Sequence, residues 1–353
     1  MLLQERLNAF VQLGNYLRAF TAGGKRDGND TDILLSQAIQ EAGMLNPWFT
    51  KKNIMMALSA IGRQLEEQNL RQWIGMYPLP DHTEHKNATV GVVTAGNIPL
   101  VGFHDFLCVL ISGHKFLGKL SSRDDKLLRT LTSILLTIEP RFAERIEFTD
   151  EFLRGYHGVI ATGNNNSARY FDYYFRNVPH IIRKNRNGIA ILNGNENKEA
   201  LERLAGDVFS YFGLGCRSVS KLYVPEGYDF SAFFEASQGW SEVIYHHHYA
   251  NNYEYNKTIF LVNKIPHIDN GFLLVKEDTS LASPVAVLYY EYYKDPALLN
   301  KKLKEMEEQI QCIVSDTWDK LSSVPFGKAQ DPELWDYADG IDTLQFLLQL
   351  KGA

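Results

Sequence analysis

The N-terminal part of the chain, to about residue 75, carries apolar side chains at helical spacing. Leu3, Phe10, Leu13 and Leu17 follow one another at separations of three, four or seven residues, which places them on one face of a helix. A polar, glycine-containing segment at 21–32 interrupts the pattern. We therefore predict N-terminal helices separated by a loop.

Near residue 88 the pattern changes to short apolar runs separated by amphipathic stretches. This alternation is typical of strand–helix–strand units on a parallel sheet. The first run ends in the loop AGNIP, and a later one ends in TGNNNSAR. The predicted strands are 89–94, 115–120 and 158–161, and the predicted helices are 101–112, 125–138 and 167–177.

A further block with the same alternation begins near residue 183 and includes the turn GLGCRS. The segment 325–353 is predicted to be a loop-rich return. The predicted strands of this block are 188–192, 221–224, 259–262, 272–275 and 285–290, and its helices are 198–212 and 300–316. Because 353 residues exceed what a single core usually holds, we predict an α/β protein with two domains on open, mainly parallel sheets and an N-terminal helical region.

Composition narrows the classes of function. The hydrophobic fraction of 45% and charged fraction of 22% are those of an ordinary globular protein, and a net charge of −6 argues against nucleic acid as a partner. The apolar runs are shorter than the roughly 20 residues that cross a bilayer, so we expect no membrane span. The N-terminus does not resemble a signal peptide, and we expect a cytoplasmic location.

The three cysteines differ in their local sequence, and their spacing suits neither disulfides nor a zinc site. Cys108 lies in an apolar predicted helix and Cys312 on the predicted helix 300–316, so both are expected to be buried. Cys216 follows Gly213-Leu214-Gly215 and precedes Arg217, whose guanidinium would favour the thiolate. Cys216 is therefore a candidate nucleophile, with a purely structural thiol as the alternative.

Other polar positions allow two interpretations each. Asn97 in AGNIP is a candidate oxyanion donor, or only fixes the turn before Pro99. The loop TGNNNSAR is a candidate pyrophosphate site, or only caps a helix. Three adjacent histidines at 246–248 cannot all face one ion, so we expect no metal there. No GxGxxG fingerprint is present, so a nicotinamide cofactor would not be held in the usual Rossmann manner.

In order and spacing, these loops resemble the aldehyde dehydrogenase superfamily, and within it the LuxC-type acyl-CoA reductases that form fatty aldehydes. The resemblance runs from about residue 89 to 346 and implies that Cys216 is the nucleophile and Asn97 the oxyanion donor. Ser122 stands where NAD-preferring members carry a ribose-binding Glu, which favours NADPH, with NADH as the alternative. The cofactor-binding residues it implies are Thr94, Ala95, Lys119, Ser121, Ser122, Arg123, Thr162, Gly163 and Asn164.

Departures from the family pattern favour its acylating branch. Hydrolytic members carry a Glu-Leu-Gly-Gly-Lys segment whose Glu activates water, and the matching residues here, 183–187, contain no carboxylate. The resemblance therefore implies reduction of acyl-CoA, or of acyl carrier protein thioesters, to an aldehyde. A Glu of the family that holds the nicotinamide ribose is matched by Ser280, and the short chain puts the family's oligomerisation arm in question.

The resemblance also implies a domain plan and partners. Residues 1–182 would be the N-terminal helices plus the cofactor-binding domain, 183–324 the catalytic cysteine domain, and 325–353 the C-terminal return segment. An acyl-protein synthetase and a second copy of the chain are the expected protein partners. The alternatives are a non-acylating aldehyde dehydrogenase and a non-catalytic subunit that retains the fold.

Overall fold

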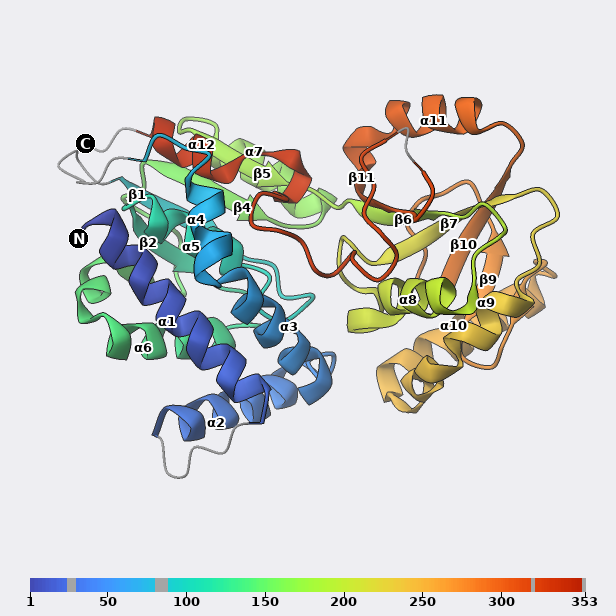
Figure 1. The fold of residues 1–353 in the computed structure, drawn as a ribbon, viewed down its shortest axis with the longest axis horizontal. Coiled ribbons are helices and arrows are strands. Elements are labelled where there is room, and N and C mark those ends of the chain that lie inside the picture. The colour runs from blue at the N-terminus through green and yellow to red at the C-terminus, as the bar shows by residue number, and fades with distance from the viewer. Residues whose placement is uncertain (24–29, 80–87, 319–320, 351–353) are drawn as a thin grey trace. The chain divides into compact units, whose positions relative to one another are not determined.

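The computed structural model describes residues 1–23, 30–79, 88–318 and 321–350. They form two compact units (Figure 1). Unit 1 comprises Met1–Lys184 and Glu333–Ala353, and unit 2 comprises Asn185–Pro332. The chain thus leaves unit 1 after strand β5 (His180–Arg183) and returns to it at Glu333. Residues 325–332 of the predicted return segment therefore belong to unit 2, and the rest of that segment belongs to unit 1.

Unit 1 is built on a five-stranded parallel sheet among the described residues, in the order β3-β2-β1-β4-β5. The order runs outward from β1 in one direction and then reverses at β4, which makes β1 and β4 the topological switch point of a doubly wound sheet. The strands are β1 (Thr89–Val93), β2 (Lys115–Lys119), β3 (Ile146–Phe148), β4 (Gly158–Thr162) and β5 (His180–Arg183).

The helices of unit 1 cover both faces of this sheet. Val90, Val92 and Ile160 face the core shared with the N-terminal helices, α5 and α6, whereas Val159 and Ala161 face Phe171 and Phe175 of α7. The helices are α1 (Leu3–Thr21), α2 (Asp30–Leu45), α3 (Lys51–Gln64), α4 (Glu67–Ile74), α5 (Phe103–Ile111), α6 (Lys126–Ile138), α7 (Asn165–Phe175), α12 (Thr343–Gln349), and the 3-10 helices η1 (Pro140–Arg145) and η5 (Ala338–Gly340).

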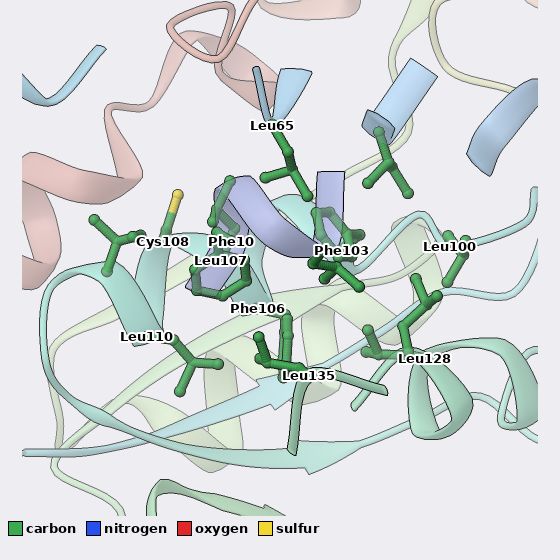
Figure 2. Packing of buried hydrophobic residues seen from close by; sticks show 14 of the residues in the cluster. Phe10, Leu65, Leu100, Phe103, Phe106, Leu107, Cys108, Leu110, Leu128 and Leu135 are labelled. Carbon is green, nitrogen blue, oxygen red and sulfur yellow. The ribbon is translucent and has the colours of Figure 1, made fainter. Parts of the chain in front are cut away.

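The main core of unit 1 joins the predicted N-terminal helices to the sheet. Figure 2 shows Phe10 of α1 against Phe106 of α5, and their rings meet edge to face with centroids 6.3 Å apart. Cys108 lies in the same cluster and is buried, as predicted. Half of the predicted loop at 21–32 lies outside the described residues, but α1 ends at Thr21 and α2 begins at Asp30.

The returning C-terminal segment is held in unit 1 by buried polar contacts. Arg183, the last residue of β5, donates to both carboxylate oxygens of Asp105 on α5, at 2.6 and 2.8 Å, and to the hydroxyl of Thr343 at 2.9 Å. His104 and His114 contact the carbonyl oxygens of Leu334 and Leu347 at 2.9 and 2.8 Å. These contacts explain why residues so far apart in the sequence share one core.

Unit 2 contains a six-stranded sheet among the described residues, in the order β11-β6-β7-β10-β9-β8, parallel except between β8 and β9. Its strands are β6 (Asn187–Ile191), β7 (Val219–Pro225), β8 (Ile268–Asp269), β9 (Leu274–Glu277), β10 (Val287–Tyr293) and β11 (Ile310–Val314). Its helices are α8 (Lys198–Phe209), α9 (Ser231–Ala236), α10 (His247–Val262), α11 (Pro296–Glu305), and the 3-10 helices η2 (Ser210–Gly213), η3 (Ser237–Tyr245) and η4 (Glu307–Gln309).

Two predicted elements of unit 2 were wrong. The apolar run 259–262 is the last turn of α10, where Leu261 and Val262 are 59% and 74% exposed, rather than a buried strand. The predicted helix 300–316 ends at Glu305, and β11 follows. Leu303, Met306, Ile310 and Ile313 fit helical spacing in the sequence, but the alternating burial of β11 shows that its own period is two. Cys312 is buried, as predicted, but on a strand.

Candidate active site

The predicted cofactor residues of unit 1 lie at the carboxyl edge of its sheet. Thr94, Ala95 and Asn97 follow β1, and Ser121, Ser122 and Arg123 follow β2. Thr162 ends β4, with Gly163 and Asn164 directly after it. Since β1 lies between β2 and β4, the three exit loops leave the sheet side by side at the switch point, where open α/β sheets bind ligands.

The exit loops of β1 and β2 are in direct contact. The Ser121 amide donates to the hydroxyl of Thr94 at 3.2 Å, and the side chain of Asn46 donates to the Gly96 carbonyl at 3.2 Å. Gly96 lies so close to the second loop that a Cβ there would stand 2.4 Å from the Ser121 hydroxyl oxygen. Only glycine allows this approach, which keeps both loops in one surface.

The side chains at this edge differ in exposure. Asn97, Ser122 and Arg123 are exposed, and Ala95 is half-buried. Lys119 donates from its ammonium to the carbonyl oxygen of Glu151 at 3.0 Å and lies 5.2 Å from the ring centroid of Phe152. The exposed side chains at this edge thus include an amide, a hydroxyl and a guanidinium. The ammonium of Lys119 is held by the segment after β3.

The third loop is arranged as a helix cap. The side-chain oxygen of Asn164 accepts from the amides of Asn166 and Ser167 at 3.0 and 2.9 Å, which satisfies two of the orphan donors of α7. The Gly163 amide donates to the carbonyl oxygen of Arg183 at 3.3 Å. The helix N-terminus keeps its favourable dipole for an anion, but those two amides already have a partner within the chain.

Burial perturbs one carboxyl at this edge. Asp124 follows Arg123 and accepts the Leu100 amide at 2.7 Å through Oδ2. Burial raises the pKa of Asp124 to about 7, reinforced by the charge of Asp125 and opposed by the hydrogen bond from Leu100. The sequence pointed to neither Asp124 nor Asn46, because both act on the loop backbone rather than through a recognisable motif.

Cys216 lies in unit 2, on the turn between η2 and the amino end of β7. Of the three cysteines it alone is exposed. Tyr211, Phe212 and Gly213, just before it, adopt left-handed backbone conformations with φ of 54°, 56° and 75°. Such a conformation is unfavourable for Tyr and Phe, but the ring of Phe212 packs against His246, with centroids 4.4 Å apart. The chain thereby turns sharply and carries the thiol to the surface.

The turn is tied to the segment 325–330. Ser218 accepts from the Gly215 amide at 3.2 Å and from the side chain of Gln330 at 3.1 Å. Arg217 donates to the carbonyl oxygen of Ala329 and lies 3.6 Å from the sulfur of Cys312. The guanidinium that the sequence assigned to activation of Cys216 is thus occupied in holding the turn to the segment after β11.

Asp207 on α8 completes this support. It is 1% exposed, and its carboxylate accepts from the amides of Gly327 and Ala329 at 2.6 and 3.0 Å. Burial raises the pKa of Asp207 to about 6, against the two amide hydrogen bonds and the charge of Arg217. An Asp in the mainly apolar stretch LAGDVFSYF is the sequence signal that points to this buried carboxyl.

Two cavities of unit 2 differ in size and in position. A cavity of about 20 Å³ lies beside the Cys216 turn, walled by Phe212, Tyr249 and Val285 among others, and is no larger than one water molecule requires. A larger cavity, of about 350 Å³, is lined by residues at the carboxyl ends of β6 and β7, including Glu196 and Tyr228. Because Cys216 precedes the amino end of β7, the larger cavity lies at the other end of that strand.

The remaining predicted features have structural partners. Ser280 donates its amide to Asp278, and the carbonyl oxygens of both residues accept from the buried ammonium of Lys221. His246 caps α10 by accepting the Tyr249 amide. The described residues contain no cluster of three or more His, Cys, Asp or Glu that would hold a metal ion. In the same ranges, no helix has the length and apolar character that a bilayer crossing requires.

Comparison with known proteins reveals similarity at the level of structure. No protein-family model and no curated protein matches the sequence. Aldehyde dehydrogenase 21 from Physcomitrella patens, solved with the product succinate, superposes with a TM-score of 0.60 at 14% identity over 97% of this chain and 87% of that one. An oxidoreductase from Marinobacter aquaeolei gives 0.64 at 8% identity over 91% and 75%.

A third similar structure is a variant of aldehyde dehydrogenase C from Pseudomonas syringae, solved with NAD+ and octanal. It gives a TM-score of 0.60 at 9% identity over 89% of this chain and 73% of that one. At such identities the likeness concerns the fold and leaves the chemistry open. The predicted fold class is confirmed: the chain has the α/β fold of the aldehyde dehydrogenases.

Proposed function

We propose that the chain reduces an acyl thioester to an aldehyde with a nicotinamide cofactor, through an acyl group carried on Cys216. The observation that carries the proposal is the placement of Cys216. It is exposed, on a turn formed by successive left-handed residues and tied down through Arg217 and Ser218, in a fold shared with aldehyde dehydrogenases. A buried, inert thiol needs no such support.

The residues at 183–187 favour the acylating branch of the proposed chemistry. A hydrolytic enzyme needs a base to activate water, and this stretch contains none. Its first residue, Arg183, is buried in an ion pair with Asp105 and is not accessible to a substrate. With no base in this segment, we propose that a thiol such as coenzyme A, or the phosphopantetheine of acyl carrier protein, exchanges with the enzyme-bound acyl group.

Residues at the carboxyl edge of the unit 1 sheet fit a nicotinamide dinucleotide. The close approach at Gly96 brings the exit loops of β1 and β2 into contact, and Ser122 and Arg123 are exposed on the second of these loops. A hydroxyl and a guanidinium, with no carboxylate at residues 119–123, suit a 2′-phosphate, so we propose NADPH over NADH. Lys119, Thr94, Ala95, Ser121, Thr162, Gly163 and Asn164 complete the proposed cofactor surface.

In the proposed reaction the thiolate of Cys216 attacks the carbonyl carbon of the thioester. The amide of Asn97 donates a hydrogen bond to the developing oxyanion. The bond to the leaving sulfur then breaks, the leaving thiolate takes up a proton, and a new thioester remains on Cys216. When bound, the reduced nicotinamide supplies a hydride to this carbonyl. The sulfur of Cys216 finally leaves, and the aldehyde is released.

Acylation of Cys216 tests the proposal without the cofactor. Incubation with acyl-CoA followed by mass spectrometry should reveal a hydroxylamine-labile adduct on the peptide that contains Cys216. Cys216→Ala should lose both the adduct and NADPH oxidation, whereas Cys108→Ala, which removes a buried thiol of unit 1, should keep both. Retention of reductase activity by Cys216→Ala would refute the assignment of the nucleophile.

A second candidate function is oxidation of aldehydes to free acids, because two of the similar structures are aldehyde dehydrogenases solved with a product or an aldehyde. Dependence on coenzyme A separates the two. Acid formation from an aldehyde and NAD+ in the absence of any thiol would favour oxidation, and thioester reduction by NADPH would favour the proposal. A chain that forms no adduct with any acyl-CoA would instead be a non-catalytic partner, for example of an acyl-protein synthetase or of a second copy of itself.

A further inference from the structure

The loop that carries Asn97 is fixed on both sides of that residue. Before it, the Gly96 carbonyl accepts from the buried side chain of Asn46 at 3.2 Å. After it, Leu100 has a left-handed backbone with φ of 58° and a side chain only 5% exposed. Leu100 belongs to the core cluster that also contains Leu128 of α6 (Figure 2). This conformation is disfavoured for any residue that has a Cβ, so the loop requires restraint at Leu100.

Asp124 supplies the restraint on the backbone. It is 6% exposed, and its Oδ2 accepts the Leu100 amide at 2.7 Å. Its own amide donates to the carbonyl oxygen of Ser121 at 2.9 Å. The Ser121 amide in turn donates to the Thr94 hydroxyl at 3.2 Å. Asp124 therefore belongs to the exit loop of β2 by sequence but holds the far end of the exit loop of β1.

We infer that Asp124 is a positioning residue that fixes Asn97 for hydrogen bonding to the substrate oxyanion and couples the Asn97 loop to the loop of Ser121, Ser122 and Arg123. The inference rests on the proposed function of Asn97. An oxyanion donor is effective only if its direction is set before the charge develops. After Asn97 in the sequence, the buried carboxyl of Asp124 and the core contacts of Leu100 fix the loop and so the direction of Asn97. Before Asn97, the side chain of Asn46 fixes the loop through the Gly96 carbonyl.

The adjacent carboxylate provides a matched control. Asp125 is the residue before α6, and its side chain makes no capping hydrogen bond to that helix. Asp125→Ala removes the same number of atoms one position away without touching the Leu100 amide. Asp124→Asn keeps one acceptor oxygen, replaces the other oxygen by an NH2 group of nearly the same size and removes the ionisation, so it reports whether acceptance of the Leu100 amide is what matters.

The test is the rate at which the full-length protein acquires the acyl adduct on Cys216, without cofactor, in single- and double-variant backgrounds. Asp124→Ala should slow acylation about tenfold, the effect of losing one hydrogen bond to a carboxylate. Asp124→Asn and Asp125→Ala should stay within about twofold of the parent. Asn97→Ala should slow it roughly 10²–10³-fold, and Asp124→Ala added to Asn97→Ala should cause no further loss.

The outcomes are separable. If Asn97→Ala slows acylation but Asp124→Ala slows it equally in both backgrounds, Asp124 does not act through Asn97 and the inference fails. The inference also fails if Asp124→Asn is acylated as slowly as Asp124→Ala. This comparison holds even if one variant is less stable, because the rates are measured per folded molecule. If Asn97→Ala has no effect while Cys216 is still acylated, the proposed role of Asn97 is itself wrong, and the inference falls with it.

Discussion

Replacing Asp105 by asparagine removes the charge that neutralises the buried guanidinium of Arg183. The two side chains are 4% and 7% exposed and are joined by hydrogen bonds of 2.8 and 2.6 Å. In the variant, Arg183 keeps the hydroxyl of Thr343 at 2.9 Å but faces a neutral amide with one acceptor oxygen. The guanidinium can neither reach water nor lose its proton at neutral pH.

We therefore expect Asp105→Asn to lower the free energy of unfolding of unit 1 substantially. Removing one partner of a buried ion pair typically costs about 3–5 kcal/mol, because the remaining charge is left desolvated and unpaired. Replacing both residues by apolar ones, Asp105→Leu with Arg183→Met, removes both desolvation penalties and should cost less than Asp105→Asn alone. The matched control is Glu67→Gln, which breaks an exposed pair with Arg71 of similar length, 2.8 Å, at a cost of no more than about 0.5 kcal/mol.

Urea denaturation measures the change, and hydrogen exchange with mass spectrometry locates it. Asp105→Asn should lower the free energy of unfolding of unit 1 and speed exchange in α5, β5 and α12, the elements that meet at Arg183. Peptides of unit 2 should exchange as in the parent protein. If Asp105→Asn lowers the free energy of unfolding no more than Glu67→Gln does, or if exchange becomes faster only in unit 2, the ion pair of Asp105 and Arg183 does not hold the C-terminal segment.

Three further predictions concern other residues of the two units. Burial lowers the pKa values of His104 and His114, so these groups make unit 1 less stable as the pH falls through about 6.5, whereas Asp124, whose pKa burial raises to about 7, has the opposite effect; in the Asp124→Asn variant the urea midpoint of unit 1 should therefore fall as the pH is lowered from 7.5 to 5.5. Gly96→Ala should weaken NADPH binding in a fluorescence titration at least tenfold, because its Cβ would stand 2.4 Å from the Ser121 hydroxyl oxygen, whereas Gly239→Ala, with no atom within 4 Å, should not. Asp207→Ala should leave two amides unpaired and destabilise unit 2 by about 1–3 kcal/mol in urea titrations.

Local patterns were sufficient for the α/β architecture and for the position of Cys216 on a turn before a strand. The strand–helix alternation from residue 88 onward predicted two mainly parallel sheets, and both are present, with one antiparallel pair, β8 and β9, in unit 2. Burial of Cys108 and Cys312 likewise follows from their apolar surroundings. Periodicity misled where one set of residues fits two periods, as in 300–316, because pairing with β6 and not local spacing turns 310–314 into a strand.

The sequence by itself determined where most strands lie and which polar loops follow them. Glycines, prolines and buried apolar runs fix such features because their effect on the backbone extends over only a few residues. Tertiary structure alone decided which distant groups meet: Asp124 at the Leu100 amide, Arg217 at the Ala329 carbonyl, and Arg183 between α5 and α12. Such partners are chosen by burial, since a desolvated polar group must find a hydrogen bond wherever the fold brings one, whatever the distance along the chain.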